Sequence, residues 1–219
     1  EKDDPLIVSF DWFHNDFGSD DHLYIVYRPQ DGDVFSERSL ATLRDFHREL
    51  EGRVRALKPG DASALKHVVK VSSLINAPVL RSVDGALVSR NLVGDDVPSG
   101  KEALEAIRQV ALSQKTFPLF YFSKDYRYGG ILVETDFGAI PLGVDGDAGP
   151  AANPGSVEID DLGLEDGQAE VSREERPKFK QTEMTDYIAL MNEVKAIMYK
   201  PEYAKQFEYH AVGNTAAAR

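Results

Sequence analysis

The chain has 219 residues, 42% of them apolar, with 37 acidic and 25 basic side chains and no cysteine. This composition predicts a globular protein of one or two domains. The net charge of −12 argues against a nucleic-acid partner, because affinity for a phosphate backbone depends on clustered Lys and Arg. The absence of Cys excludes disulfides, thiolate metal sites and cysteine nucleophiles. No apolar run approaches the roughly 20 residues that cross a bilayer.

The acidic side chains are concentrated in two segments. Residues 1–33 carry nine acids and two bases, and residues 145–175 carry ten acids and one base, which leaves the rest of the chain nearly neutral. The chain starts with Glu, and neither a basic start nor the apolar core of a signal peptide follows. We therefore expect it to be a piece of a longer protein, whose targeting or membrane-spanning segments lie outside this sequence.

The first part of the chain predicts a strand followed by a helix. Residues 1–21 have no clear period and form a leading segment, with a short strand over Leu6 to Phe10. Leu23 to Arg28 is rich in β-branched and aromatic residues, which is typical of a buried strand. Apolar residues three or four positions apart from Leu40 to Leu57 predict a helix with one apolar stripe.

This helix has clear boundaries in the sequence, and a second strand follows it. Ser36 is the expected N-cap, and Pro59 with Gly60 ends the helix. Residues His67 to Ile75 predict the next strand. The three elements form a βαβ unit, whose crossover is expected to be right-handed. The following residues are interpreted as an irregular excursion that contains Asp84-Gly85, Gly94 and Pro98.

The middle of the chain predicts a helix and a hairpin. Ser99 and Glu102 have the spacing of a capping box, so a helix is expected over residues 100–114. The runs 118–125 and 129–137 are rich in aromatic and β-branched residues, and a short connection separates them. They therefore predict a β-hairpin.

The last third begins with a segment that is unlike the rest. Residues 143–178 hold six Gly, three Pro and few large apolar residues, so they predict an acidic, mobile linker that buries too little surface to become ordered. A helix over Met184 to Met198 follows, with Thr182 as its expected cap and Pro201 as its end.

The element order predicts an α+β fold, in which helices cover one face of a sheet of four or more strands. Its simplest instance is the ferredoxin-like split βαβ sandwich, here with a long acidic loop. Residues 22–142 would form the main α+β domain, and residues 179–214 would complete it with the last helix and a strand over 207–214. Residues 215–219 are a tail of small residues. This fold serves many functions and assigns none by itself.

One cluster of side chains has the chemistry to bind a divalent cation, namely Asp11, His14, Asp16, Asp20, Asp21 and His22. It lacks the spacing of a calcium loop and the His-Glu-x-x-His helix of zinc hydrolases, so a solvated acidic connection is the favoured interpretation. His47 and His67 are interpreted as structural or surface residues. No nucleophile elbow, phosphate-binding loop or dinucleotide fingerprint is present. We expect neither catalysis nor a cofactor.

Aromatic side chains are crowded in two places, the leading segment and the predicted hairpin. Because side chains alternate between the two faces of a strand, some of them are expected to point away from the core. Outward aromatics suggest a partner surface or an apolar ligand path, although core packing accounts for most of them. The candidates for a substrate path or interface are Trp12, Phe13, Phe17, Phe120, Phe122, Tyr126 and Tyr128.

Three blocks of the sequence resemble a known family. They are 17–50 with "HLYIVYR", 68–80 with "VVKVSSLINAPVL" and 121–138 with "FYFSKDYRYGGILVETDFG". They resemble the first large extracytoplasmic loop of bacterial exporters of the resistance-nodulation-division (RND) superfamily, and most closely its MmpL-like, lipid-exporting branch. The segment 207–214 resembles the stretch before the second membrane helix. The places of a family hairpin motif are occupied by Ser123, Asp125, Arg127, Ile131 and Val133.

The resemblance implies a ferredoxin-like porter domain at the periplasmic face of the bacterial inner membrane. Its partners would be a second periplasmic loop and the membrane helices of the same transporter, and a homo-oligomer is compatible with it. Its substrate would be hydrophobic or lipid-like. Because the family's proton relay lies in membrane helices, the chain alone is expected to have no turnover. Trp12, Phe13 and Phe17 are then expected near the membrane-facing end.

Two other hypotheses stay open. The first is a soluble, ferredoxin-like ligand-sensing or assembly module, whose sheet face binds a small molecule or another copy of the chain. The second is a metal-dependent hydrolase built on the cluster from Asp11 to His22.

Overall fold

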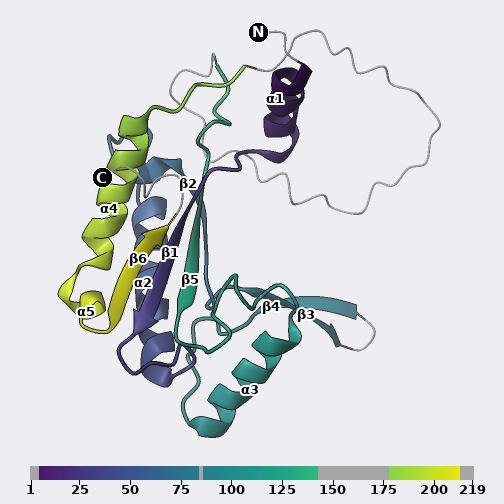
Figure 1. Cartoon of the computed structure of the whole chain (residues 1–219), viewed down its shortest axis with the longest axis vertical. Coiled ribbons are helices and arrows are strands. Elements are labelled where there is room, and N and C mark those ends of the chain that lie inside the picture. Colours follow the sequence, from purple (N-terminus) through teal and green to yellow (C-terminus); the bar gives the residue numbers. More distant parts are fainter. Residues whose placement is uncertain (1–4, 84–85, 143–177, 213–219) are drawn as a thin grey trace.

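A computed structural model describes residues 5–83, 86–142 and 178–212 and confirms the predicted α+β class (Figure 1). The helices are α1 (Pro5–Phe17), α2 (Glu37–Arg55), the 3-10 turn η1 (Ala64–His67), α3 (Lys101–Ser113), α4 (Met184–Met198) and α5 (Pro201–Ala204). The strands are β1 (His22–Pro29), β2 (Val68–Ser72), β3 (Pro78–Val83), β4 (Ala86–Asn91), β5 (Gly129–Thr135) and β6 (Phe207–Val212). None of the helices in these residues combines the length and the apolar character that a membrane span requires.

Four strands form one antiparallel sheet in the order β2-β5-β1-β6. β1 pairs with β5 on one side and with β6 on the other, and β5 also pairs with β2. Because every neighbouring pair is antiparallel, β1 and β2 point the same way, with β5 inserted between them. The crossover through α2 therefore spans a strand that comes later in the chain.

The core lies between one face of this sheet and the helices α2 and α4. In β1, fully buried residues alternate with half-exposed ones, as expected for a strand with only one face against a core. The ring of Phe46 on α2 lies 5.9 Å from that of Tyr209 on β6. Tyr209 is opposite Tyr27 in the register, so α2 packs on the face that carries Tyr27. In Figure 1, α2 lies behind the sheet and α4 runs beside β6.

The helix predicted from its apolar stripe is α2, and its cap is as predicted. The hydroxyl oxygen of Ser36 accepts a hydrogen bond from the backbone N–H of Ser39 at 3.0 Å, which satisfies one of the free donors of the first turn. The helix ends at Arg55, ahead of Pro59. Its buried stripe contains Leu40, Leu43, Phe46 and Leu50.

The segment interpreted as an irregular excursion forms a second, two-stranded sheet instead. β3 and β4 are antiparallel, with Val83 opposite Ala86, so the pair Asp84-Gly85 connects the two strands. This dipeptide is a strong hairpin signal. The prediction missed it because β4 is mostly exposed and carries no apolar alternation. In Figure 1 the hairpin projects from the body of the molecule, near α3.

The strand predicted over residues 118–125 is wrong, whereas the run 129–137 contains β5. Only single bridges occur in the first run, between Pro118 and Phe122 and between Phe122 and Gly129. Leu119 and Tyr126 have φ angles of +72° and +60°. A regular strand does not contain this left-handed conformation, so the predicted hairpin is a compact loop followed by β5.

Several local predictions also need correction. The leading segment contains the helix α1 and no strand over Leu6 to Phe10. α3 begins after Gly100 without a side-chain cap, so Ser99 does not form the expected capping box. Thr182 does not cap α4, because Glu183 is the N-cap and forms a capping box with Asp186; the Thr182 hydroxyl instead accepts a hydrogen bond from the Gly138 N–H at 2.9 Å. The acidic linker lies outside the described residues except for its last residue.

Candidate functional site

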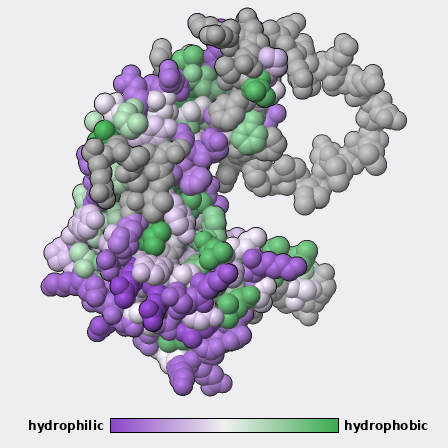
Figure 2. Space-filling view, viewed as in Figure 1, coloured by the Kyte–Doolittle hydropathy of each residue, from purple (hydrophilic) through white to green (hydrophobic). Residues whose placement is uncertain are grey.

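The face of the sheet opposite α2 and α4 carries an apolar pocket. The pocket has a volume of about 190 Å³ and lies where β1 and β5 meet the loop 117–128. Figure 2 views the molecule from this side and shows apolar patches among strongly hydrophilic surface. The side chains and backbone that line the pocket belong to Tyr24, Val26, Leu119, Phe122, Ser123, Tyr128, Gly129 and Gly130.

Tyr24 and Gly130 form the floor of this pocket. The Tyr24 hydroxyl crosses over Gly130 and donates a hydrogen bond to the carbonyl oxygen of Phe120. A Cβ atom at Gly130 would overlap both the hydroxyl and that carbonyl oxygen, so only glycine leaves room for the contact. Burial raises the pKa of the Tyr24 hydroxyl, which therefore remains a donor at neutral pH.

A network of turn hydrogen bonds fixes the loop above the floor. The Ser123 hydroxyl donates to a carboxylate oxygen of Asp125 at 2.6 Å and accepts from the N–H of Tyr128 at 3.0 Å. The hydrogen bond from Ser123 lowers the pKa of Asp125, and the N–H of Arg127 adds to the effect. Ser123, Asp125 and Arg127 therefore form a turn that shapes one wall of the pocket.

Arg108 on α3 holds the same loop from the core side. Its guanidinium lies 5.2 Å from the ring centre of Tyr126 and 5.5 Å from that of Phe35, close enough for cation–π attraction. It also forms an ion pair with Asp33. Tyr126, whose positive φ costs conformational energy, is thus retained by contacts on its ring.

Four of the seven predicted candidates meet in this loop. Phe122 and Tyr128 line the pocket, and Phe120 supplies the carbonyl oxygen over its floor. Phe120 and Tyr128 are 42% and 38% exposed, whereas Phe122 is 2% exposed and belongs mainly to the core. Tyr126 is half-buried beneath Arg108 and does not line the pocket.

The other three candidates lie on α1, away from the pocket. α1 leads into the His22 end of β1, whereas the pocket extends along β1 from Tyr24 to Val26 and is closed by the loop 117–128 and the start of β5. Trp12 is half-buried and Phe13 is exposed, and the side chain of Phe17 lies outside the described residues. The structure therefore separates the two aromatic groups.

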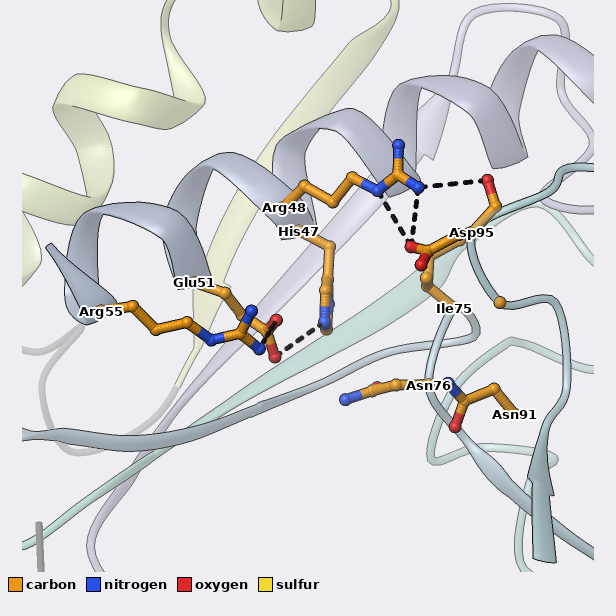
Figure 3. A pocket seen from close by; sticks show the side chains of 9 residues that line it. His47, Arg48, Glu51, Arg55, Ile75, Asn76, Asn91 and Asp95 are labelled. Atoms are coloured by element: carbon orange, nitrogen blue, oxygen red, sulfur yellow. Dashed lines mark hydrogen bonds and ion pairs between the residues drawn. The ribbon is translucent and has the colours of Figure 1, made fainter.

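A second, polar pocket of about 520 Å³ lies between α2 and the loops that flank the β3–β4 hairpin (Figure 3). Its central side chain is His47, which is 3% exposed and bonded at both ring nitrogens. Burial lowers the pKa of His47, so the ring is neutral at pH 7. A carboxylate only accepts, so Nε2–H donates to Glu51 at 3.2 Å and Nδ1 accepts from the Ser73 hydroxyl at 3.1 Å.

Two ion pairs flank this histidine. Arg55 binds the other carboxylate oxygen of Glu51 at 2.7 Å. Arg48 binds Asp95 through both Nε and Nη2, at 2.9 Å and 2.7 Å. The pocket thus holds two cations and two anions around a neutral imidazole. No local pattern predicts this pocket, because it depends on the tertiary contact of His47 with Ser73 and on Asn91 and Asp95, which lie in the segment interpreted as an irregular excursion.

The acidic cluster of the leading segment is only partly assembled. His14 Nε2 lies 3.3 Å from a carboxylate oxygen of Asp20, whereas Asp21 accepts a hydrogen bond from the Tyr187 hydroxyl. His22 turns its Nδ1 to the backbone oxygen of Asp20, and the side chain of Asp11 lies outside the described residues. Within the described part of the chain, no group of three or more acidic, His or Cys side chains is placed to hold a metal ion.

No relative of the chain was found by comparison. No family model matches it, and neither a curated protein nor a solved structure is detectably similar to it.

Proposed function

We propose that this chain is a porter domain of an RND-superfamily, MmpL-like exporter, in which the apolar pocket forms part of the path of a hydrophobic or lipid-like substrate. The domain would have the ferredoxin-like fold and stand at the periplasmic face of the inner membrane. The observation that carries the proposal is the apolar pocket on the sheet face opposite α2 and α4, where two of the aromatic candidates line it.

The strand order supports the fold part of the proposal. A ferredoxin-like sheet has two βαβ units interleaved, so each crossover helix spans a strand of the other unit. Here α2 connects β1 to β2 across β5, and α4 connects β5 to β6 across β1. The β3–β4 hairpin and α3 would be an insertion between the two units.

The position of the first and last strands supports the placement between two membrane helices. Tyr24 near the start of β1 pairs with Val212 at the end of β6. The chain therefore enters and leaves the sheet at adjacent points on one end, as a domain inserted between neighbouring membrane helices requires. Trp12 and Phe13 on α1 lie on the path into that same end.

A titration with N-phenyl-1-naphthylamine, an apolar dye that fluoresces when desolvated, tests the pocket. We expect saturable binding to the chain and about fivefold weaker binding to the Leu119→Asp variant, because the new carboxylate would be placed in an apolar wall. Leu119 is 68% exposed and has a positive φ that Asp tolerates, so the fold should persist. The matched control is Leu87→Asp on β4, where Leu87 is 78% exposed. Equal binding by both variants would contradict a substrate role for the pocket.

The exporter part has its own test, the sequence of the parent gene on both sides of this chain. Apolar runs of about 20 residues on each side are the expected result. Polar flanks would overturn the exporter proposal. Dye binding would then show only that the pocket accepts apolar ligands in a protein of another class.

A second candidate function is a soluble ligand-sensing module of the same fold. The polar pocket around His47 favours it, because a volume of about 520 Å³ lies in the range of small-molecule sites. Polar flanks in the parent gene would make this candidate the leading one.

A further inference from the structure

We infer that the pocket between α2 and the hairpin loops binds a small zwitterion, a molecule that carries one ammonium and one acidic group. The inference does not depend on the exporter proposal, because it concerns a different pocket on another side of the sheet. It is based on charge balance and on polar atoms in the pocket that have no partner among the described residues.

The charges in the pocket cancel. Arg48 and Arg55 supply two cations, Glu51 and Asp95 supply two anions, and His47 is neutral. Arg55 and Asp95 at the two ends are exposed, so a ligand gains there from charge complementarity and not from desolvation. A ligand with one charge of each sign meets an opposite charge at both ends and leaves the net charge of the pocket at zero.

Each end of the pocket keeps unused bonding capacity. Arg55 uses only Nη2, on Glu51, so its Nε and Nη1 have no partner among the described residues. Arg48 binds Oδ1 and the backbone oxygen of Asp95, and no donor from the described residues reaches Oδ2. One end can thus bind an acidic group, and the other an ammonium group.

The pocket is also held open by its own bonds. The Asn76 side chain donates to the Val71 carbonyl oxygen at 2.7 Å and accepts from the Ser73 N–H at 2.9 Å. It therefore stabilises the turn below the pocket. In Figure 3 the Asn91 side chain lies opposite α2 and faces the space between the charged ends. No hydrogen bond of that amide occurs within the described part of the chain, so it can bind the middle of a ligand.

The spacing on the helix sets the size of the ligand. Arg48 and Arg55 are seven positions apart, which is about 10.5 Å along the helix axis, and the two side chains share one face. A ligand of the size of an amino acid or a tripeptide spans part of that distance. The head group of a zwitterionic phospholipid has the same chemistry, and the experiment separates the two sources.

Calorimetric titration of the chain with triglycine and with glycerophosphoethanolamine tests the inference. We expect at least one of them to bind. If triglycine is preferred, two analogues that each lack one of its charges, N-acetyl-triglycine and triglycinamide, should bind about tenfold more weakly than triglycine. Tighter binding of triglycine identifies a peptide-like ligand, and tighter binding of glycerophosphoethanolamine identifies a lipid head group. For the latter, glycerophosphoglycerol, a phosphodiester that lacks the ammonium group, is the singly charged comparison.

Variants assign the two ends. Arg55→Gln and Asp95→Asn should each weaken the preferred zwitterion about tenfold, to the affinity of the singly charged analogue. Both side chains are 76% exposed, so neither change should affect folding. Arg53→Gln, on the same helix but paired with Glu49, is the matched control and should bind as the parent chain does. No binding at about 10 mM, equal binding of the analogues, or unchanged binding by both variants would overturn the inference.

Discussion

The carboxylate of Glu193 on α4 binds both the backbone N–H of Ala64 at 2.6 Å and the hydroxyl of Ser63 at 2.5 Å. These two donors belong to the start of η1, far from α4 in the sequence. The carboxylate therefore satisfies a helix terminus from another element and ties the two crossover connections of the sheet together.

Glu193→Ala should lower the free energy of unfolding by about 1–3 kcal/mol, because it leaves a partly buried N–H without its acceptor. Urea unfolding followed by circular dichroism measures the change. Asn192→Ala is the control, since Asn192 is the exposed neighbour on the same helix. Equal stabilities of the two variants would show that water replaces Glu193 at no cost.

Gly130→Ala should destabilise the protein by about 1–3 kcal/mol, because the new methyl group would displace the Tyr24 hydroxyl or the Phe120 backbone. Gly52→Ala is the same change in the last turn of α2, where no atom lies within 4 Å of the added Cβ. That variant should be more stable by up to about 1 kcal/mol. Thermal unfolding of both variants measures the two changes in stability, which should have opposite signs. A Gly130→Ala variant as stable as the parent chain would mean that the position of Tyr24 over β5 does not contribute to stability.

Acid should destabilise the fold through His47. Burial places the pKa of His47 below its ordinary value of 6.5, so the unfolded chain binds a proton more readily than the folded chain does. The stability linked to this group is fully present above about pH 6.5 and is lost as the pH falls through the lower, folded pKa. Urea midpoints should therefore decrease from pH 7.5 to pH 5.5.

The His47→Gln variant separates this effect from the titration of other groups. It should be less stable at pH 7.5, because the contacts with Ser73 and Glu51 change, but it should show a smaller decrease in midpoint toward pH 5.5. His210→Gln is the matched control, since it makes the same change at a side chain that is 51% exposed. A pH profile of His47→Gln that matches the parent chain would contradict the assignment.

The parts of the fold that sequence patterns predicted are those in which a local signal and the tertiary structure agree. The apolar stripe of α2 and its Ser36 cap are both short-range, and β1 is a run of β-branched and aromatic residues. The strand prediction within the loop 117–128 was wrong because these residues have side chains typical of strands. Leu119 and Tyr126 nevertheless adopt a left-handed backbone conformation, which follows from packing and turn hydrogen bonds. Strand propensity alone does not predict where tertiary packing imposes a different backbone conformation.

The candidate sites were less predictable than the elements. The crowding of aromatics in the loop before β5 pointed to Phe122 and Tyr128, but not to Tyr24, whose importance depends on Gly130 in a strand far along the chain. His47 was interpreted as structural or surface, because nothing local relates it to Ser73. Contacts of this kind can be predicted only when the strand order and the packing of the helices are known.

The order of the strands also governs when the protein can fold during its synthesis. β1 is synthesised before both of its neighbours, β5 and β6. Tyr24 therefore has no pairing partner on the β6 side until Val212, the last described residue, has been made. Until β5 is made β1 has two open edges, and until β6 is made it keeps one, and an open edge can pair with other chains. The late strand β6 thus covers the last open edge of β1, and a nascent chain that stalls before Phe207 would leave that edge unpaired.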